Sequence, residues 1–219
     1  MRHLIVVLGA ALTLGAVAQD TPARRVPLSA RPRAEREAAA SNPARDWTRF
    51  RGPNGSGVVD SSSFPTEFGP EKNVVWKVDL PPGHSSPVLD RDRVYVTASE
   101  GDSLLTLAID RASGAILWRR EAPRPRVLRV DKRNNPASAT PATSDGNVFV
   151  FFQDFGLISY DRTGRERWKV PLGPFDNAYG MGASPIVADG LVIMVCDQSN
   201  GSFMIALGQD DGTIRWRVE

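Results

Sequence analysis

The stretch TPATSDGNVFVFFQDFGLISYDRTGRERW, residues 140–168, contains the pattern on which the fold depends. It begins with Thr140-Pro141, turns at Asp145-Gly146, and continues through two β-rich runs to a glycine turn and Trp168. Short runs of β-branched and aromatic residues between Asp-Gly turns are typical of β-hairpins. The stretch therefore predicts an antiparallel meander of four short strands.

The same pattern occurs in two further units, which begin at Ser86-Pro87 and Ser184-Pro185. Their predicted first turns are Asp92-Arg93 and Asp189-Gly190. Each unit closes with a tryptophan, and the closing residues are Trp118, Trp168 and Trp216. A repeat of about 50 residues that contains four strands is typical of a propeller blade.

These units predict an all-β fold, a β-propeller of four-stranded antiparallel blades, with blades at about 84–121, 138–171 and 182–219. One extra strand is expected at Val74–Val78, where Trp76 lacks the three segments that precede the other tryptophans. Closed propellers usually have about four to eight blades. Three blades and one strand fall short of this number, and the sequence shows no capping segment of the kind that repeat arrays need. We therefore expect an N-terminal piece of a ring of seven or eight blades.

The turn before each closing tryptophan contains residues that suit tight backbone geometry. An aspartate can bond to its own backbone, and glycine adopts a positive φ without strain. We interpret this set as structural and not catalytic, and it comprises Asp110, Gly114, Asp161, Gly164 and Gly212.

The N-terminal region predicts export. Residues 1–18 combine Arg2, an apolar run over 4–14 and the small residues of Ala16-Val17-Ala18, which is the pattern of a secretory signal peptide cleaved after Ala18. A membrane anchor would need about 20 apolar residues, and this run has roughly 11. Residues 19–45 are rich in Ala, Pro and Arg and predict a disordered linker before a folded region at 46–219. The mature protein should be periplasmic or extracellular and lack a transmembrane anchor.

Charge and single reactive residues give few functional signals. The net charge of +2 does not call for nucleic acid. The basic residues near 124–133 predict solvated loops or linkers. Cys196 is the only cysteine, so no internal disulfide can form, and we expect a buried residue on a strand. His84 is the only histidine after signal cleavage and is expected in a loop.

The repeat resembles the PQQ-like (pyrroloquinoline-quinone) repeat, also called the tryptophan-docking blade, of the quinoprotein alcohol dehydrogenase-like superfamily. The resemblance rests on the small residue before proline, the Asp-Gly turn, the Ala-Leu/Ile-Asp segment, the glycine and the terminal tryptophan, and it covers about Val74–Glu219. It implies that Trp118, Trp168 and Trp216 pack between neighbouring blades. The motif Trp47–Gly57 resembles the start of exported bacterial PQQ-like propeller proteins and has no assigned role.

Quinoprotein dehydrogenases of this superfamily hold PQQ over calcium, with a stacking tryptophan, carboxylate and amide ligands and often adjacent cysteines. A single cysteine cannot supply the adjacent pair. Asp154 and Asp176 are candidates for an axial metal, but acidic residues are common in loops and no ligand cluster is recognisable. No catalytic or metal-binding residue is therefore predicted, and cofactor binding stays open.

Three functions remain. The favoured one is a non-catalytic exported propeller that binds a protein partner or small ligand at its face. The second is a PQQ- and calcium-dependent quinoprotein dehydrogenase whose site lies mostly outside this chain. The third is an outer-membrane protein assembly component, against which the lack of a lipid-anchoring cysteine argues, since Gln19 and Asp20 follow the predicted cleavage site. Fold alone does not decide among them.

Overall fold

The computed structural model describes residues 2–6, 46–59 and 64–219 of the 219-residue chain. The predicted linker at 19–45 and the predicted signal peptide beyond Val6 lie outside these residues. Within the described residues, the only helical element is the short 3-10 helix η3 (Pro53–Gly55), and the named elements are otherwise strands.

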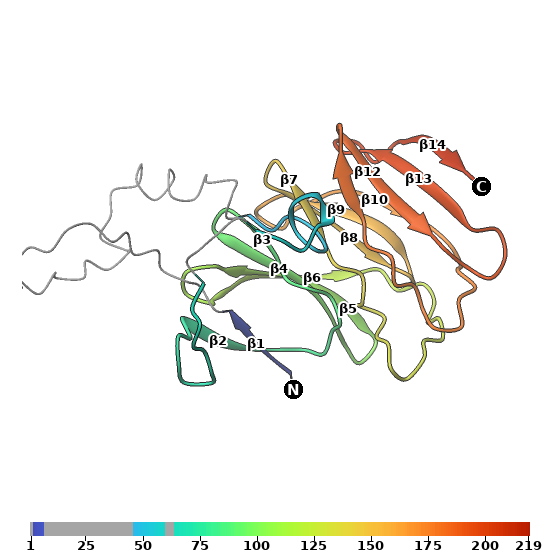
Figure 1. Ribbon diagram of the computed structural model, residues 1–219. Helices are drawn as coiled ribbons and strands as arrows, with labels where there is room; N and C mark the ends of the chain where they lie inside the picture. The colour runs from blue at the N-terminus through green and yellow to red at the C-terminus, as the bar shows by residue number, and fades with distance from the viewer. Residues whose placement is uncertain (1, 7–45, 60–63) are drawn as a thin grey trace, which may run out of the picture.

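Three four-stranded antiparallel sheets form the body of the protein, and in each sheet the strands follow one another in chain order (Figure 1). The first blade contains β3 (Val88–Asp90), β4 (Arg93–Glu100), β5 (Ser103–Asp110) and β6 (Ile116–Ala122). The second contains β7 (Ala142–Ser144), β8 (Asn147–Phe152), β9 (Gly156–Tyr160) and β10 (Glu166–Pro171). The third contains β11 (Ile186–Ala188), β12 (Leu191–Cys196), β13 (Phe203–Gly208) and β14 (Ile214–Val218). The prediction of three four-stranded blades of a propeller is confirmed.

The predicted extra strand is also present and has a partner. It is β2 (Trp76–Leu80), which begins two residues later than expected and pairs antiparallel with β1 (Arg2–Val6). In this register Arg2 lies opposite Leu80 and Val6 lies opposite Trp76. The first residues of the chain therefore form a two-stranded sheet with β2.

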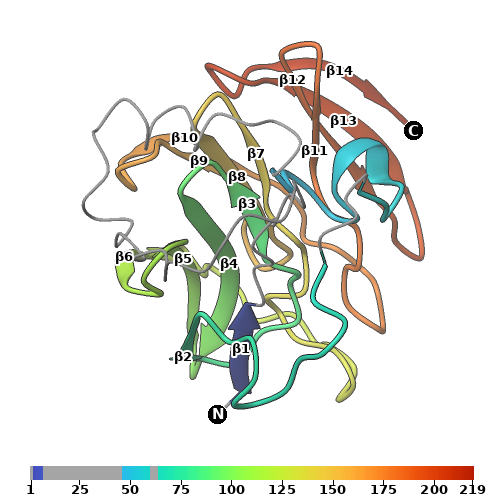
Figure 2. The ribbon, with the colours of Figure 1, turned by 60° about the vertical axis from the view of Figure 1, so that its left-hand side comes forward.

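The first strand of each blade forms the inner edge of the array. β7 contacts both β3 and β11, so the three blades fan outward from adjacent inner strands (Figure 2). Because the strands alternate in direction, the β3–β4 and β5–β6 turns lie at the same end of the first blade, which we call the turn end. The β4–β5 turn and the long β6–β7 connection lie at the opposite end, which we call the loop end. The other blades follow the same scheme.

Side chains of the middle strands pack on both faces. On β8, Val148 and Val150 belong to the cluster between the first and second blades. Phe149 and Phe151 belong to the cluster between the second and third blades. Each of these side chains is at most 1% exposed. This double burial explains the nearly continuous apolar sequence of β8, because a strand with two covered faces has no polar side.

The first turn of the first blade differs from the prediction. β3 ends at Asp90 and β4 begins at Arg93, so the turn is Arg91-Asp92 and not Asp92-Arg93. Arg91 takes the positive-φ position (54°) that Asp145 (52°) and Asp189 (49°) take in the other blades. The sequence suggested otherwise because aspartate adopts this conformation more readily than arginine.

Candidate functional site

Two tryptophans join consecutive blades by the same contact. The Nε1 of Trp118 donates a hydrogen bond to the carbonyl of Arg162 in the second blade at 3.0 Å. Its ring lies directly on Gly164, where an added Cβ would be 2.7 Å from the indole. Trp168 repeats both contacts on the third blade, with the carbonyl of Gln209 at 3.0 Å and Gly212 beneath the ring. These contacts place the predicted glycines under the tryptophans of the preceding blade.

A further tryptophan, predicted from the sequence only as part of an extra strand, makes the same contact. Trp76 on β2 donates to the carbonyl of Arg111 at 2.8 Å, and its ring covers Gly114. The signal was present in the sequence, since Trp76-Lys77-Val78 repeats Trp168-Lys169-Val170. Trp76, Trp118 and Trp168 are each 7–8% exposed, whereas Trp216 on β14 is only half-buried.

The predicted turn aspartates bond to their own turns. The Oδ1 of Asp161 accepts hydrogen bonds from the backbone of Thr163 at 2.7 Å, from its hydroxyl at 2.6 Å and from the backbone of Arg165 at 3.0 Å. Burial raises the pKa of Asp161, but the bonds from Thr163 and Arg165 outweigh it and hold the pKa below its ordinary value. Asp110 likewise accepts from the backbone of Ala112 and Ser113.

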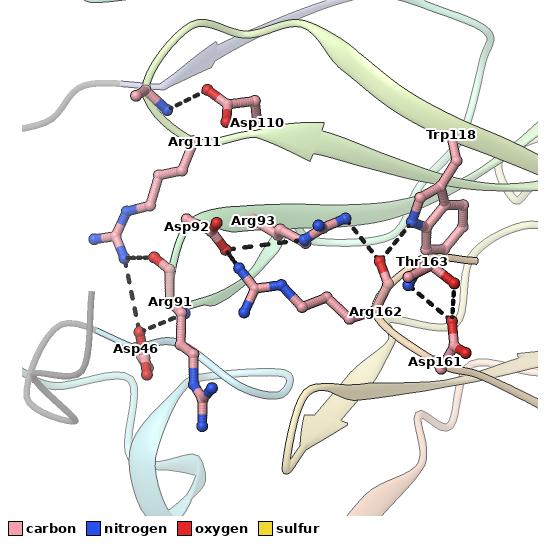
Figure 3. A network of polar contacts seen from close by, with 11 residues as sticks. Asp46, Arg91, Asp92, Arg93, Asp110, Arg111, Trp118, Asp161, Arg162 and Thr163 are labelled. Atoms are coloured by element: carbon pink, nitrogen blue, oxygen red, sulfur yellow. Dashed lines mark hydrogen bonds and ion pairs between the residues drawn. The ribbon is translucent and has the colours of Figure 1, made fainter. Parts of the chain in front are cut away.

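A polar network extends this docking across the turn end (Figure 3). The carbonyl of Arg162 accepts a second hydrogen bond, from the guanidinium of Arg93 at 2.7 Å. The guanidinium of Arg162 reaches back to Asp92 in the turn of the first blade. Each blade therefore gives a charged group to its neighbour, and the network joins the first and second blades.

The repeated Ser/Thr-Pro dipeptides form a second chain of contacts between blades. The hydroxyl of Thr140 accepts a hydrogen bond from the backbone N–H of Ser86 at 3.0 Å, and the hydroxyl of Ser184 accepts one from the N–H of Thr140 at 2.9 Å. A residue before proline is restricted to an extended conformation. These positions align in the sequence, and their recurrence before proline was a usable signal for the role of their hydroxyls, which was not predicted.

At the loop end, a buried carboxylate fixes the β6–β7 connection. Asp154 lies in the β8–β9 turn and is fully buried. Its Oδ2 accepts from the Nε of Arg124 at 2.7 Å, and its Oδ1 accepts from the N–H of Leu128 at 3.0 Å. Arg126 donates to the carbonyls of Asp154 and Leu172. The prediction that this basic segment is solvated is therefore wrong for Arg124 and Arg126.

Uncharged side chains hold the neighbouring β10–β11 connection. The side chain of Asn134 donates to the carbonyl of Tyr179 at 2.8 Å. The buried Gln153 accepts from the N–H of Met181 at 2.8 Å, and the hydroxyl of Ser138 donates to the carbonyl of Met181 at 2.9 Å. The side chain of Tyr179 remains 66% exposed on this fixed backbone.

The residues described do not fit a PQQ–calcium site. Both carboxylate oxygens of Asp154 already have partners, and Asp154 lies on a turn between middle strands and not at the inner edge. Asp176 and His84 are exposed on separate connections. Across residues 46–59 and 64–219, no group of three or more His, Cys, Asp or Glu side chains could hold a metal ion.

Cys196 lies in the core between the second and third blades, as expected for a strand residue. Burial raises the pKa of its thiol to about 12. None of the helical segments that the structure describes is long and apolar enough to cross a membrane.

A family model described as "Outer membrane protein assembly factor BamB" matches residues 69–126 and 105–219. No curated protein sequence matches the chain. A europium-containing methanol dehydrogenase is similar in structure, with 16% identity over 84% of this chain and 33% of that chain, and a TM-score of 0.55. This likeness supports the fold alone.

Two further solved structures are similar over part of the chain. BamB from Moraxella catarrhalis shows 20% identity over 68% of this chain and 43% of that chain, with a TM-score of 0.46. A quinohemoprotein alcohol dehydrogenase from Comamonas testosteroni shows 20% identity over 63% of this chain and 21% of that chain, with a TM-score of 0.45. The present chain thus spans less than half the length of each of these proteins.

Proposed function

Since the chain belongs to the PQQ-like repeat family described as outer membrane protein assembly factor BamB, we propose that it is an exported propeller module that binds another protein and does not itself catalyse a reaction. The partner we propose is a protein of outer-membrane protein assembly, and the support for this choice is the family description, which names an assembly factor. The predicted signal peptide is consistent with export of the chain.

The observation that supports binding is the combination of exposure and rigidity at the loop end. Tyr179 is 66% exposed and Val127 is 67% exposed, on the two connections that follow β10 and β6. Hydrogen bonds to Asp154, Gln153 and Asn134 hold the backbone of both connections, and the Asp154 and Gln153 side chains are buried. A binding surface that is already ordered loses less conformational entropy when a partner docks, and tyrosine is enriched at interfaces.

Site-specific crosslinking in the full-length protein, in its own cells, tests this proposal. A photoreactive amino acid at Tyr179 is expected to give one defined protein adduct from the outer-membrane assembly machinery. The matched control is the same amino acid at Arg165, whose side chain is 83% exposed at the turn end of the second blade. Adducts of equal yield at both positions, or none at Tyr179, would contradict binding through the loop end.

Calorimetric titration of the mature full-length protein with PQQ, with and without calcium, tests the non-catalytic part of the proposal. We expect no binding heat in either condition. Tight, calcium-dependent binding by the folded protein would contradict a purely binding role and would support the dehydrogenase alternative.

A further inference from the structure

The segment that contains the motif Trp47–Gly57 lies against the inner edges of two blades. We propose that residues 46–57 form a strap that joins β3 of the first blade to β7 of the second and covers their inner edges against pairing with other chains. This inference goes beyond the proposed function, because the strap contacts the turn end and the partner surface lies at the loop end.

The backbone of the strap bonds to equivalent positions of the two blades. Trp47 donates to the carbonyl of Leu89 at 2.9 Å and accepts from the N–H of Leu89 at 2.8 Å. The carbonyl of the next residue, Thr48, accepts from the N–H of Thr143 at 2.8 Å. Leu89 and Thr143 are both the middle residues of their inner strands, β3 and β7. Two consecutive strap residues thus bind two consecutive blades.

These backbone groups need such a partner. In an antiparallel ladder, alternate residues direct their N–H and C=O away from the neighbouring strand. The groups of Leu89 point away from β4, since both are bonded to Trp47. A strand edge with open N–H and C=O groups is a template for pairing with another chain. The strap occupies this template at β3 and satisfies the N–H at β7.

The glycines of the motif allow the strap to fold back on itself. Gly52 has φ of 65°, and an added Cβ would lie 2.4 Å from the ring of Trp47. The N–H of Gly52 donates to the carbonyl of Arg49 at 2.9 Å, and the N–H of Gly57 donates to the carbonyl of Arg51 at 2.7 Å. The indole of Trp47 is therefore packed on its own turn, which holds residues 47 and 48 extended along the blades.

A side-chain contact anchors the start of the strap. The Oδ1 of Asp46 accepts from the backbone N–H of Arg91 at 3.0 Å and lies 3.7 Å from the guanidinium of Arg111 (Figure 3). Both arginines lie in turns of the first blade, and Arg111 also donates to the carbonyl of Arg91 at 3.0 Å. The first blade thus holds the strap at its backbone and at the Asp46 side chain.

Amide hydrogen exchange of the full chain tests the strap. Val187 is the internal reference, because it occupies the same position in β11 and the described residues give it no strap partner. Val192 in the adjacent ladder reports any fraying of the third blade. We expect the amides of Leu89 and Thr143 to exchange at least about tenfold more slowly than the amide of Val187, since both are hydrogen-bonded. Equal rates at the three positions would overturn the proposal without any variant.

The matched variants are Gly52→Ala and Gly55→Ala. Both glycines have positive φ, but an added Cβ meets the Trp47 ring only at Gly52, and at Gly55 nothing lies within 4 Å. We expect Gly52→Ala to speed exchange at Leu89 and Thr143 and to leave Val187 and Val192 unchanged, whereas Gly55→Ala has a smaller effect. Unchanged protection at Leu89 and Thr143 in Gly52→Ala would contradict the strap.

Discussion

Each docking tryptophan uses both parts of its side chain. The indole N–H satisfies a turn carbonyl of the next blade, and the ring covers a glycine that leaves room for it. A buried indole N–H without an acceptor would cost the desolvation of that group. Glycine is therefore required at this position for two reasons: the backbone has a positive φ, and an added side chain would collide with the indole ring.

The substitution Gly164→Ala separates these two requirements when it is compared with Gly101→Ala. Both residues have positive φ (82° and 56°), but only at Gly164 does a Cβ meet a neighbour, the Trp118 ring at 2.7 Å. We expect Gly101→Ala to lower the free energy of unfolding by about 1 kcal/mol, from backbone strain alone. Gly164→Ala should lower it by about 3 kcal/mol or more. Urea denaturation measures both, and equal losses would show that the ring contact is not required.

The lowered pKa of Asp161 predicts a dependence of stability on pH. Its folded pKa lies below the unfolded value of about 3.9, so its contribution is complete above that value and is lost as pH falls through the folded pKa. Asp161→Asn keeps an acceptor for Thr163 but cannot titrate. We expect the unfolding free energy of the variant to fall less steeply than that of the wild type below about pH 4. If the unfolding free energies of the variant and the wild type fell in parallel from pH 6 to pH 3, this assignment would be contradicted.

The β6–β7 connection at the loop end is held by a buried charge, whereas most loops lie on the surface and are more mobile than the strands they join. Arg124 pairs with the fully buried Asp154 at 2.7 Å, and the same carboxylate holds Leu128. This contact explains how a segment rich in arginine and proline keeps one conformation.

The pair Arg124–Asp154 predicts a large effect from the removal of one partner. Arg124→Met leaves the carboxylate of Asp154 buried without its cation, and we expect a loss of about 3–5 kcal/mol in stability. The control is Arg129→Met, since Arg129 is exposed in the same connection and should change stability by less than about 0.5 kcal/mol. Thermal unfolding distinguishes them. A loss below about 1 kcal/mol for Arg124→Met would show that water reaches Asp154.

At the scale of the whole molecule, each blade interacts with its neighbours through the same three contacts: tryptophan on glycine, the Ser/Thr hydroxyl chain, and an aromatic and aliphatic core between sheets. Stability in such arrays is approximately the sum of blade and interface terms. The interface between the second and third blades can be followed separately, because it contains the only cysteine.

Cys196 therefore reports the opening of this interface. With the pKa of its thiol raised to about 12 and its side chain fully buried, the native protein should not react with a thiol reagent at pH 8. One thiol should react in 6 M guanidinium, a concentration of the order that unfolds very stable proteins. Rapid reaction of the native protein would mean that the second and third blades separate readily.

The sequence alone determined the repeat and therefore the blades. The turn chemistry and the apolar runs are local, so they predicted the sheets around β4, β8 and β12 without knowledge of their neighbours. The resemblance placed tryptophans between blades, and the turn glycines followed from backbone conformation. The boundary errors at Arg91-Asp92 and at the start of β2 arose because pairing register decides where a strand begins, and register depends on the partner strand.

Only the tertiary structure decided which residues meet across blades. Trp76 was predicted only as part of an extra strand, because the three segments that precede the other tryptophans are missing before it, and its docking on Gly114 became visible only in the fold. Arg124 and Asp154 looked like ordinary loop charges, and the motif at Trp47 had no assigned role, because their partners lie far away in sequence. Local pattern fixes strands and turns, since these depend on neighbouring residues. Long-range burial and hydrogen bonding fix the docking, the buried ion pair and the strap, and these depend on how the blades are placed side by side.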